Sequence, residues 1–192
     1  MMKNINYYKE YERRKQNGNE NEKSVYMQNL LCELPGLYQE KNVKTSLAAI
    51  FLLDLLFSFE ISDSAIREGL MNVSSQTGLN GRWQVLSQKP LTIADTGHNE
   101  AGMKEVSSQI KKTPHKNLHI VFGTVNDKDV SGILKLLPKK AVYYFCKANI
   151  PRALDTDELI AQAKPFKLNG NAYKSVKEAL KFAKKGAKKK DL

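Results

Sequence analysis

The sequence predicts an α/β protein in which a mostly parallel β-sheet is flanked by helices and preceded by a mainly helical segment. Short apolar runs alternate with amphipathic helical patterns from residue 81 onward, and such alternation is typical of parallel sheets covered by helices on both faces. Helical periodicity dominates residues 43–72 instead. The chain has 192 residues, of which 41% are hydrophobic, so a globular protein with a sizeable core is expected.

Each element of the alternating region has its own signal. Apolar runs on either side of a Gln88-Lys89-Pro90 turn predict two short strands, and two further buried runs predict two more. The expected strands are 83–86, 91–94, 118–123 and 141–146. Four helices are expected: one that begins after Asn99, and three at 128–137, 155–163 and 175–184. Each begins at a capping residue or ends before a proline or a basic run.

The amino-terminal part is expected to be mainly helical. Residues 1–31 are polar, and three tyrosines at helical spacing predict an amphipathic helix in the first half of this segment, followed by a loop. Asn42 is expected to cap a helix at 43–57, whose apolar residues lie on more than one side, as in a buried helix. A second helix, 62–72, is expected to open at its first serine.

The net charge of +11 raises the question of an anionic partner. Much of the excess lies in the lysine-rich stretch 181–190, which contains no arginine. Surfaces that bind nucleic acid more often mix arginine with aromatic residues. The pattern therefore favours a solvated helix end, and a basic nucleic-acid-binding module is the alternative.

Other features favour a cytoplasmic protein without a metal site. Cys32 and Cys146 show no pairing pattern, and the amino terminus lacks the apolar core of a secretory signal. The longest apolar segment, 47–59, is too short to cross a bilayer and contains an aspartate, so no membrane association is expected. The three histidines lack the spacing of a zinc site.

A polar turn follows the strand expected at 91–94. Asp95 and His98 place a carboxylate and an imidazole where a strand ends and a helix begins, with Asn99 as the expected helix cap and Gly97 easing the turn. Ligands of open α/β sheets bind at that edge, and helix N-termini offer N–H groups to anions. The alternative is that Asp95 and Asn99 only cap the helix and that His98 packs in a loop.

The sequences GRWQVL (81–86) and ADTGHNEAG (94–102) together resemble the carboxy-terminal domain of folylpolyglutamate synthase, also called dihydrofolate synthase, in the Mur ligase family. Gly97 stands where that family usually has alanine. Residues 34–73 resemble the end of the family's central ATPase domain. The resemblance implies that 1–78 is the carboxy-terminal part of the central domain, and that 79–192 is the Rossmann-like carboxy-terminal domain with its last strand missing.

The resemblance also implies an activity: ATP-dependent addition of glutamate to folate or dihydropteroate through an acyl phosphate. Under it, Arg82 would be a catalytic residue and would contact ATP, although an arginine at such a position is more often in a surface salt bridge. Asn42 would contact the adenine and Asp95 the ribose of ATP. His98 would orient Asp95, touch the nucleotide or approach the acyl phosphate, and Arg152 could face a substrate carboxylate.

The family's phosphate-binding P-loop, G-x-x-G-K-[ST], does not occur in the 192 residues. The resemblance therefore implies an incomplete enzyme, inactive alone. Its Mg²⁺ ligands would lie in a missing amino-terminal part, which another chain could carry. A Mur-type ligase acting on a cell-wall precursor is the alternative within the family.

Overall fold

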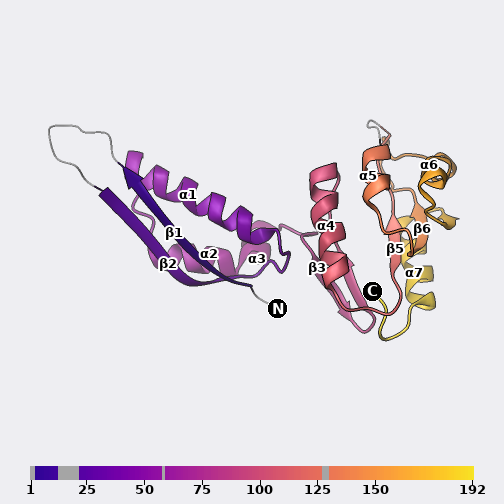
Figure 1. Cartoon of the computed structure of the whole chain (residues 1–192), viewed down its shortest axis with the longest axis horizontal. Coiled ribbons are helices and arrows are strands. Elements are labelled where there is room, and N and C mark those ends of the chain that lie inside the picture. Colours follow the sequence, from indigo (N-terminus) through magenta and orange to yellow (C-terminus); the bar gives the residue numbers. More distant parts are fainter. Residues whose placement is uncertain (1–2, 13–21, 58, 127–129) are drawn as a thin grey trace. The chain divides into compact units, whose positions relative to one another are not determined.

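The computed structural model describes residues 3–12, 22–57, 59–126 and 130–192. The chain divides into two compact units, Met1–Gln84 and Val85–Leu192, which are coloured indigo to magenta and magenta to yellow in Figure 1. The boundary predicted after residue 78 lies a few residues before this division.

Unit 1 begins with an antiparallel hairpin, β1 (Lys3–Glu12) and β2 (Glu22–Cys32), in which Ile5 pairs with Leu30. The amphipathic helix predicted for the first half of residues 1–31 and the loop predicted for the second half are therefore wrong for residues 3–12 and 22–31, and the rest of both predictions lies outside the described residues. The side chains explain the difference, because burial alternates with the two-residue period of a strand from Asn4 to Tyr7.

A β-bulge interrupts this hairpin. The pairing passes from Ile5–Leu30 to Tyr7–Met27, so β2 has one residue more than β1 between the two pairs. Asn29, in the extra stretch, adopts a left-handed φ of 54°. Asparagine is among the few non-glycine residues that tolerate this conformation. Its backbone N–H donates to Asn6 Oδ1 at 3.0 Å, which fixes the bulge on the β1 side.

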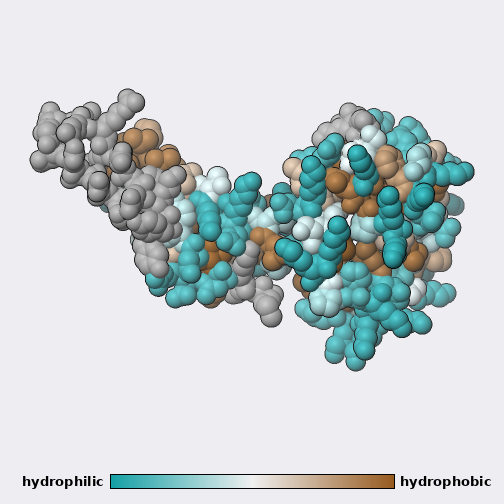
Figure 2. All heavy atoms as spheres, viewed as in Figure 1, coloured by the Kyte–Doolittle hydropathy of each residue, from teal (hydrophilic) through white to brown (hydrophobic). Residues whose placement is uncertain are grey.

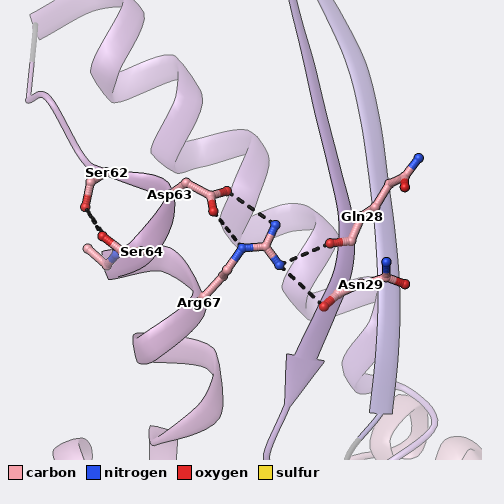
Figure 3. Close-up of polar contacts among 7 residues, drawn as sticks. Gln28, Asn29, Ser62, Asp63, Ser64 and Arg67 are labelled. Atoms are coloured by element: carbon pink, nitrogen blue, oxygen red, sulfur yellow. Dashed lines mark hydrogen bonds and ion pairs between the residues drawn. The ribbon is translucent and has the colours of Figure 1, made fainter.

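An arginine from helix α2 (Asp63–Met71) holds the bulge on the other side (Figure 3). Arg67 Nη1 donates to the carbonyl oxygens of Gln28 at 3.1 Å and of Asn29 at 3.4 Å. Its Nε donates to Asp63 Oδ2 at 2.6 Å, one helical turn earlier. The guanidinium thus connects the start of α2 to backbone carbonyls that the bulge removes from the β-ladder.

The first long helix, α1 (Gln39–Phe57), begins four residues before its predicted start, and α3 (Val73–Thr77) follows α2. Asn42 therefore lies inside the first turn of α1, and its predicted role as a helix cap is wrong. The earlier start follows from the turn before it, because the Gln39 N–H donates to the Gly36 carbonyl at 3.0 Å. The predicted opening of α2 is confirmed: Ser62 Oγ accepts the Ala65 N–H at 3.2 Å.

The core of unit 1 is small. Its buried apolar residues are Ile5, Tyr7, Met27, Leu30, Cys32, Val43, Leu47 and Ile66. Helix α1 contributes only Val43 and Leu47 to this set, and Leu52, Leu56 and Phe57 on the same helix are exposed. The prediction that this helix is buried on more than one side is therefore wrong for unit 1 as described.

Unit 2 contains a parallel three-stranded sheet in the order β5 (His119–Phe122), β6 (Val142–Cys146), β7 (Gly170–Tyr173). Strands β3 (Gln84–Gln88) and β4 (Leu91–Ala94) pair with each other across the predicted turn. The α/β class and the parallel, helix-flanked sheet are confirmed. Strand β7 was not predicted.

Three helices cover one face of this sheet: α4 (Glu100–Lys112), α5 (Ser131–Leu136) and α6 (Thr156–Ala163). Their apolar residues form one core with Tyr143 and Phe145 of the central strand, both fully buried. Part of the segment expected as a helix at 128–137 lies outside the described residues. The helix that is described ends just before Pro138, as predicted.

The last helix, α7 (Val176–Gly186), covers the other face. Its Ala179 and Ala183 pack against Tyr144 and Cys146, the strand neighbours that point away from the first core. Strand β7 is reached from α6 through a short 3₁₀ turn, Lys164–Phe166. Val176, the first residue of this helix, is 46% exposed.

The final residues return to the sheet. The Leu192 N–H donates to the Asn117 carbonyl at 3.0 Å, and the His119 N–H donates to the Leu192 carbonyl at 2.7 Å. This is the bonding pattern of a parallel pair, so Leu192 lies beside the start of β5 on the side opposite β6. No helix in the described ranges is both long and apolar enough to cross a bilayer.

Candidate functional site

The turn after β4 is held by its own side chains. Asp95 is half-buried, and its Oδ1 accepts the Gly97 N–H at 2.8 Å. Asn99 Oδ1 accepts the Gly102 N–H at 2.8 Å, which satisfies one of the free donors at the start of α4. The predicted helix cap at Asn99 is therefore confirmed, and Asp95 organises the turn that precedes the cap.

His98 lies between these two residues and is exposed, so it does not pack in the loop as the alternative reading required. Its Nδ1 lies 3.1 Å from the Thr96 carbonyl oxygen. A carbonyl only accepts, so Nδ1 carries the proton in this hydrogen bond and Nε2 is the lone-pair nitrogen of the neutral ring. The imidazole is thus oriented by a backbone carbonyl, with Nε2 pointing away from this hydrogen bond.

Helix packing places this turn at one end of unit 2. A Cβ atom on Gly132 of α5 would meet the carboxylate of Glu100, the first residue of α4. Further along, Ser107 Oγ donates to the Leu136 carbonyl at 2.9 Å. The two helices therefore run side by side in the same direction. Because α5 follows the carboxyl end of β5, the Asp95–Asn99 turn lies at the carboxyl end of the sheet, where ligands bind in this class of fold.

Arg152 lies at the same end. It is exposed in the loop after β6, and its carbonyl accepts the Asn126 N–H at 2.9 Å. The Leu154 N–H also donates to the Thr124 carbonyl at 2.9 Å. These bonds join the loops that follow β5 and β6, so Arg152 lies at the carboxyl end of these strands. Residues 127–129, which follow Asn126, lie outside the described part of the chain.

Arg82 has an unusual backbone environment. Gly81 and Trp83 on either side of it have φ values of 73° and 53°. For Trp83 this conformation costs about 1–3 kcal/mol. The Gly81 N–H donates to Gln84 Oε1 at 3.1 Å, which ties the turn to the start of β3. Arg82 itself is half-buried. The strain therefore fixes the direction in which the chain enters β3 and presents Arg82.

Asn42 lies on the exposed first turn of α1. Its Nδ2 donates to Gln39 Oε1 at 2.9 Å, and Gln39 is 4% exposed. Gln39 was not predicted as a site residue. Its spacing of three residues from Asn42 on one helix is the available signal, but the helix predicted from the sequence starts at residue 43 and excludes Gln39.

The structure thus brings Asp95 and His98 into one turn and places Arg152 at the same end of unit 2, whereas Asn42 and Arg82 belong to unit 1. Within the described ranges, no three His, Cys, Asp or Glu side chains gather in a way that would hold a metal ion.

The chain is similar to known proteins. Residues 81–192 match the family model for the Mur ligase, glutamate ligase domain. The dihydrofolate synthase/folylpolyglutamate synthase of Escherichia coli (strain K12) is 30% identical over 158 residues, which are 81% of this chain and 34% of that protein. A probable bifunctional folylpolyglutamate synthase/dihydropteroate synthase of Haloferax volcanii is 31% identical over 144 residues, 74% of this chain and 16% of that protein.

Solved structures agree. E. coli FolC in complex with DHPP and ADP superposes with a TM-score of 0.71 and 27% identity, over 93% of this chain and 40% of that chain. The bifunctional enzyme from Yersinia pestis CO92 gives a TM-score of 0.68 and 26% identity, over 92% and 40%. The chain spans 34% of the length of its E. coli relative. Since the glutamate ligase domain covers residues 81–192, more than half of the sequence, the chain belongs to the Mur ligase family.

Proposed function

We propose that this chain is part of an ATP-dependent ligase that adds glutamate to folate or dihydropteroate. The observation that carries the proposal is the Asp95–Asn99 turn at the carboxyl end of a sheet that matches the glutamate ligase domain. The names of the relatives support the substrate class. A related enzyme has been solved with Mn, AMPPNP and L-glutamate, and E. coli FolC with DHPP and ADP.

In this proposal the chain has two parts. Residues 1–78 are the carboxy-terminal part of a central ATPase domain, and residues 79–192 are the carboxy-terminal domain without its last strand. The partners are ATP, glutamate and folate or dihydropteroate, in the cytoplasm. An amino-terminal domain that carries a P-loop and the Mg²⁺ ligands would complete the enzyme, in the same protein or on another chain.

The chemistry requires charge stabilisation. The γ-phosphoryl group of ATP is transferred to the substrate carboxylate, ADP leaves, and the glutamate amine then attacks the acyl phosphate and displaces phosphate. Negative charge accumulates on the phosphoryl oxygens, so fixed positive groups are the main catalytic device. Arg82 would serve here, because its planar guanidinium is always charged and binds two phosphate oxygens at once.

The other residues would position the nucleotide and the substrate. Asp95 would accept hydrogen bonds from the ribose hydroxyls, and Asn42 would contact the adenine edge through its side-chain amide. His98 would present Nε2 to the nucleotide or the acyl phosphate. Arg152 would pair with a substrate carboxylate at the same end of unit 2.

Trp83 offers a direct test, since it is the only tryptophan and adjoins Arg82. Titrating ATP into the chain while following Trp83 fluorescence should show weak, saturable binding. Arg82→Lys and Asp95→Asn should weaken this binding. Lys89→Gln, which changes an exposed residue in the turn between β3 and β4, should not. A response that none of these variants alters would reject the assignment of the ATP contacts.

A ligase assay with dihydropteroate and glutamate tests the second part of the proposal. The 192 residues should give no turnover, because no sequence among them can form the phosphate-binding loop. Turnover from this chain alone, free of contaminating host enzyme, would disprove that part.

A second candidate is a Mur-type ligase for a cell-wall precursor. The UDP-N-acetylmuramoyl-L-alanyl-D-glutamate–2,6-diaminopimelate ligase of Wolinella succinogenes is 31% identical over 98 residues, 50% of this chain and 20% of that protein. The two candidates differ in the acid that ATP activates and in the amine that then attacks the acyl phosphate. A competition experiment between a UDP-muramoyl dipeptide and dihydropteroate separates them. The acid whose binding depends on Arg152 identifies the candidate.

A further inference from the structure

The net positive charge of this protein belongs to one of its two units. The segment Met1–Gln84 contains ten basic and ten acidic residues, so the whole net charge of +11 belongs to Val85–Leu192. Within that unit, four short segments carry thirteen lysines and a single acidic residue, Asp191. These segments are 111–118, 135–142, 164–169 and 184–192. We refer to them together as the lysine edge.

Topology brings the four segments together. The first three lead directly into the parallel strands β5, β6 and β7, so they lie at the same, amino-terminal end of the sheet. Backbone bonds connect them: the Val142 N–H donates to the Leu118 carbonyl at 2.9 Å, and the Tyr143 N–H to the Asn169 carbonyl at 3.1 Å. The fourth segment joins through the Lys116 N–H, which donates to the Lys190 carbonyl at 2.8 Å.

The lysines of this edge are available to a ligand. All thirteen are exposed, and none of them forms an ion pair with a carboxylate of the described ranges. The single acidic residue, Asp191, is 3% exposed, and its oxygens accept hydrogen bonds from Asn117 and Lys188. Figure 2 shows hydrophilic side chains crowding the end of this unit where the yellow loop before the C-terminus lies in Figure 1.

This edge is distinct from the candidate ligand site. Asp95, His98 and Arg152 lie at the carboxyl end of the sheet, and the lysine edge lies at the amino end. A solvated tail, as the sequence suggests for 181–190, does not explain why lysines also gather in the three segments that lead into β5, β6 and β7. Like charges gathered in this way destabilise the folded state through self-repulsion, and a bound polyanion relieves that repulsion.

We propose that the lysine edge binds nucleic acid through the phosphate backbone, without sequence preference. Lysine is a point charge that neutralises phosphates and releases their counterions. The edge contains no arginine to fork onto bases, so the contacts position phosphates and read no bases.

The apolar contacts argue for nucleic acid over an anionic membrane surface. A helix that binds at a membrane interface buries an apolar face in the lipid. In α7, the helix that ends in the edge, Ala179 and Ala183 are already buried against the sheet. Phe182 packs on Tyr173, with ring centroids 5.2 Å apart. Val176 and Phe182 of this helix are 46% and 45% exposed, but they lie six residues apart and therefore on different faces, so α7 presents charge at its end and no continuous apolar face to lipid.

The test compares two variants of equal charge. The edge variant combines Lys116→Gln, Lys139→Gln, Lys140→Gln and Lys189→Gln. The control combines Lys89→Gln, Lys104→Gln, Lys174→Gln and Lys177→Gln, four exposed lysines of the same unit outside the edge. Each set lowers the net charge by four. Fluorescence anisotropy with a labelled 20-base-pair DNA duplex, at a series of NaCl concentrations, measures affinity and its salt dependence, and thermal unfolding confirms that both variants fold.

The native chain should bind the duplex at low salt, and the edge variant should bind on the order of a hundredfold more weakly, with the slope of log K against log salt reduced by about 0.9 per lysine removed. The control should stay within a few-fold of the native chain. Equal losses in the two variants would show bulk charge only and overturn the proposal, as would absent binding at low salt. Edge-dependent binding to vesicles of anionic phospholipid or to polyglutamate, without binding to DNA, would overturn it as well.

Discussion

Asp191 and Asn117, 74 residues apart in the sequence, are joined by two hydrogen bonds. Asp191 Oδ1 accepts the Asn117 backbone N–H at 3.1 Å and its side-chain Nδ2 at 3.0 Å. Asp191 Oδ2 accepts the Lys188 N–H at 2.8 Å and lies 3.5 Å from His119 Nε2. One carboxylate therefore fixes the end of the chain to the segment that enters β5.

This arrangement predicts acid sensitivity. The hydrogen bond from the Lys188 backbone, together with those from Asn117 and His119, holds the pKa of Asp191 below its ordinary value against the opposing effect of burial. Because the folded pKa is lowered, the stabilisation is fully present above the unfolded pKa of about 3.9 and is lost as pH falls through the folded pKa.

Urea unfolding at pH 7 and pH 3 measures the effect. Asp191→Asn should lower stability at pH 7 and reduce the difference between the two pH values. Glu105→Gln, which removes an exposed carboxylate on α4, serves as the control and should leave the pH dependence nearly native. If Asp191→Asn retains the full native pH dependence, the carboxylate does not anchor the tail.

Arg67 gives a second prediction. Arg67→Lys keeps the charge but cannot reach both carbonyls of the β2 bulge and Asp63 at once, because the ammonium lacks the guanidinium fork. We expect a loss of about 1 kcal/mol in the free energy of unfolding. Lys44→Gln removes an exposed ion pair with Glu40 at the same helical spacing and should cost no more than about 0.5 kcal/mol. Equal losses would mean that the carbonyl contacts contribute nothing.

Much of the fold could be predicted because its signals are local. For several elements the hydrophobic pattern is complete within the element itself. These are the strands β5 and β6, with their apolar runs, and the capped helices α4, α6 and α7. Strand β7 has no such run, since Gly170-Asn171-Ala172-Tyr173 becomes a strand only by pairing with β6. Strand β1 did carry a two-residue alternation, but three tyrosines at helical spacing favoured the wrong period.

The third prediction compares the cost of adding a Cβ atom at two glycines, Gly170 in strand β7 and Gly97 in the turn before α4. A Cβ on Gly170 would meet the Tyr143 backbone oxygen in the neighbouring strand, so Gly170→Ala should destabilise by about 1–3 kcal/mol. A Cβ on Gly97 would lie 3.3 Å from both Asp95 Oδ1 and Val106 Cγ2, a tight contact that small shifts relieve. Gly97→Ala should therefore change stability by less than about 1 kcal/mol. Thermal unfolding of both variants checks this, and a larger loss at Gly97 than at Gly170 would contradict it.

The candidate site was predictable to the extent that its contacts are short in sequence. Asp95 bonds two residues ahead and Asn99 three residues ahead, and both patterns are visible in the sequence. The capping preference of asparagine predicts Asn42 at a helix start. That prediction is wrong because the turn at Gly36 starts α1 earlier, at Gln39. Contacts such as Arg67 to Asn29, 38 residues apart, follow no local period and become apparent only in the folded chain.

The last prediction concerns the cap itself. Asn99→Ala leaves the Gly102 N–H without its side-chain acceptor and should cost about 1 kcal/mol of stability. Asn99→Asp keeps an acceptor and adds a negative charge at the helix N-terminus, so it should be as stable as the native chain or slightly more so. Hydrogen exchange at the first turn of α4 should quicken in the alanine variant and stay slow in the aspartate variant. Because Asp95 and His98 lie on the same turn, Asn99→Ala should reduce the change in Trp83 fluorescence that ATP causes. An unchanged response would mean that the turn does not need the cap to present these side chains.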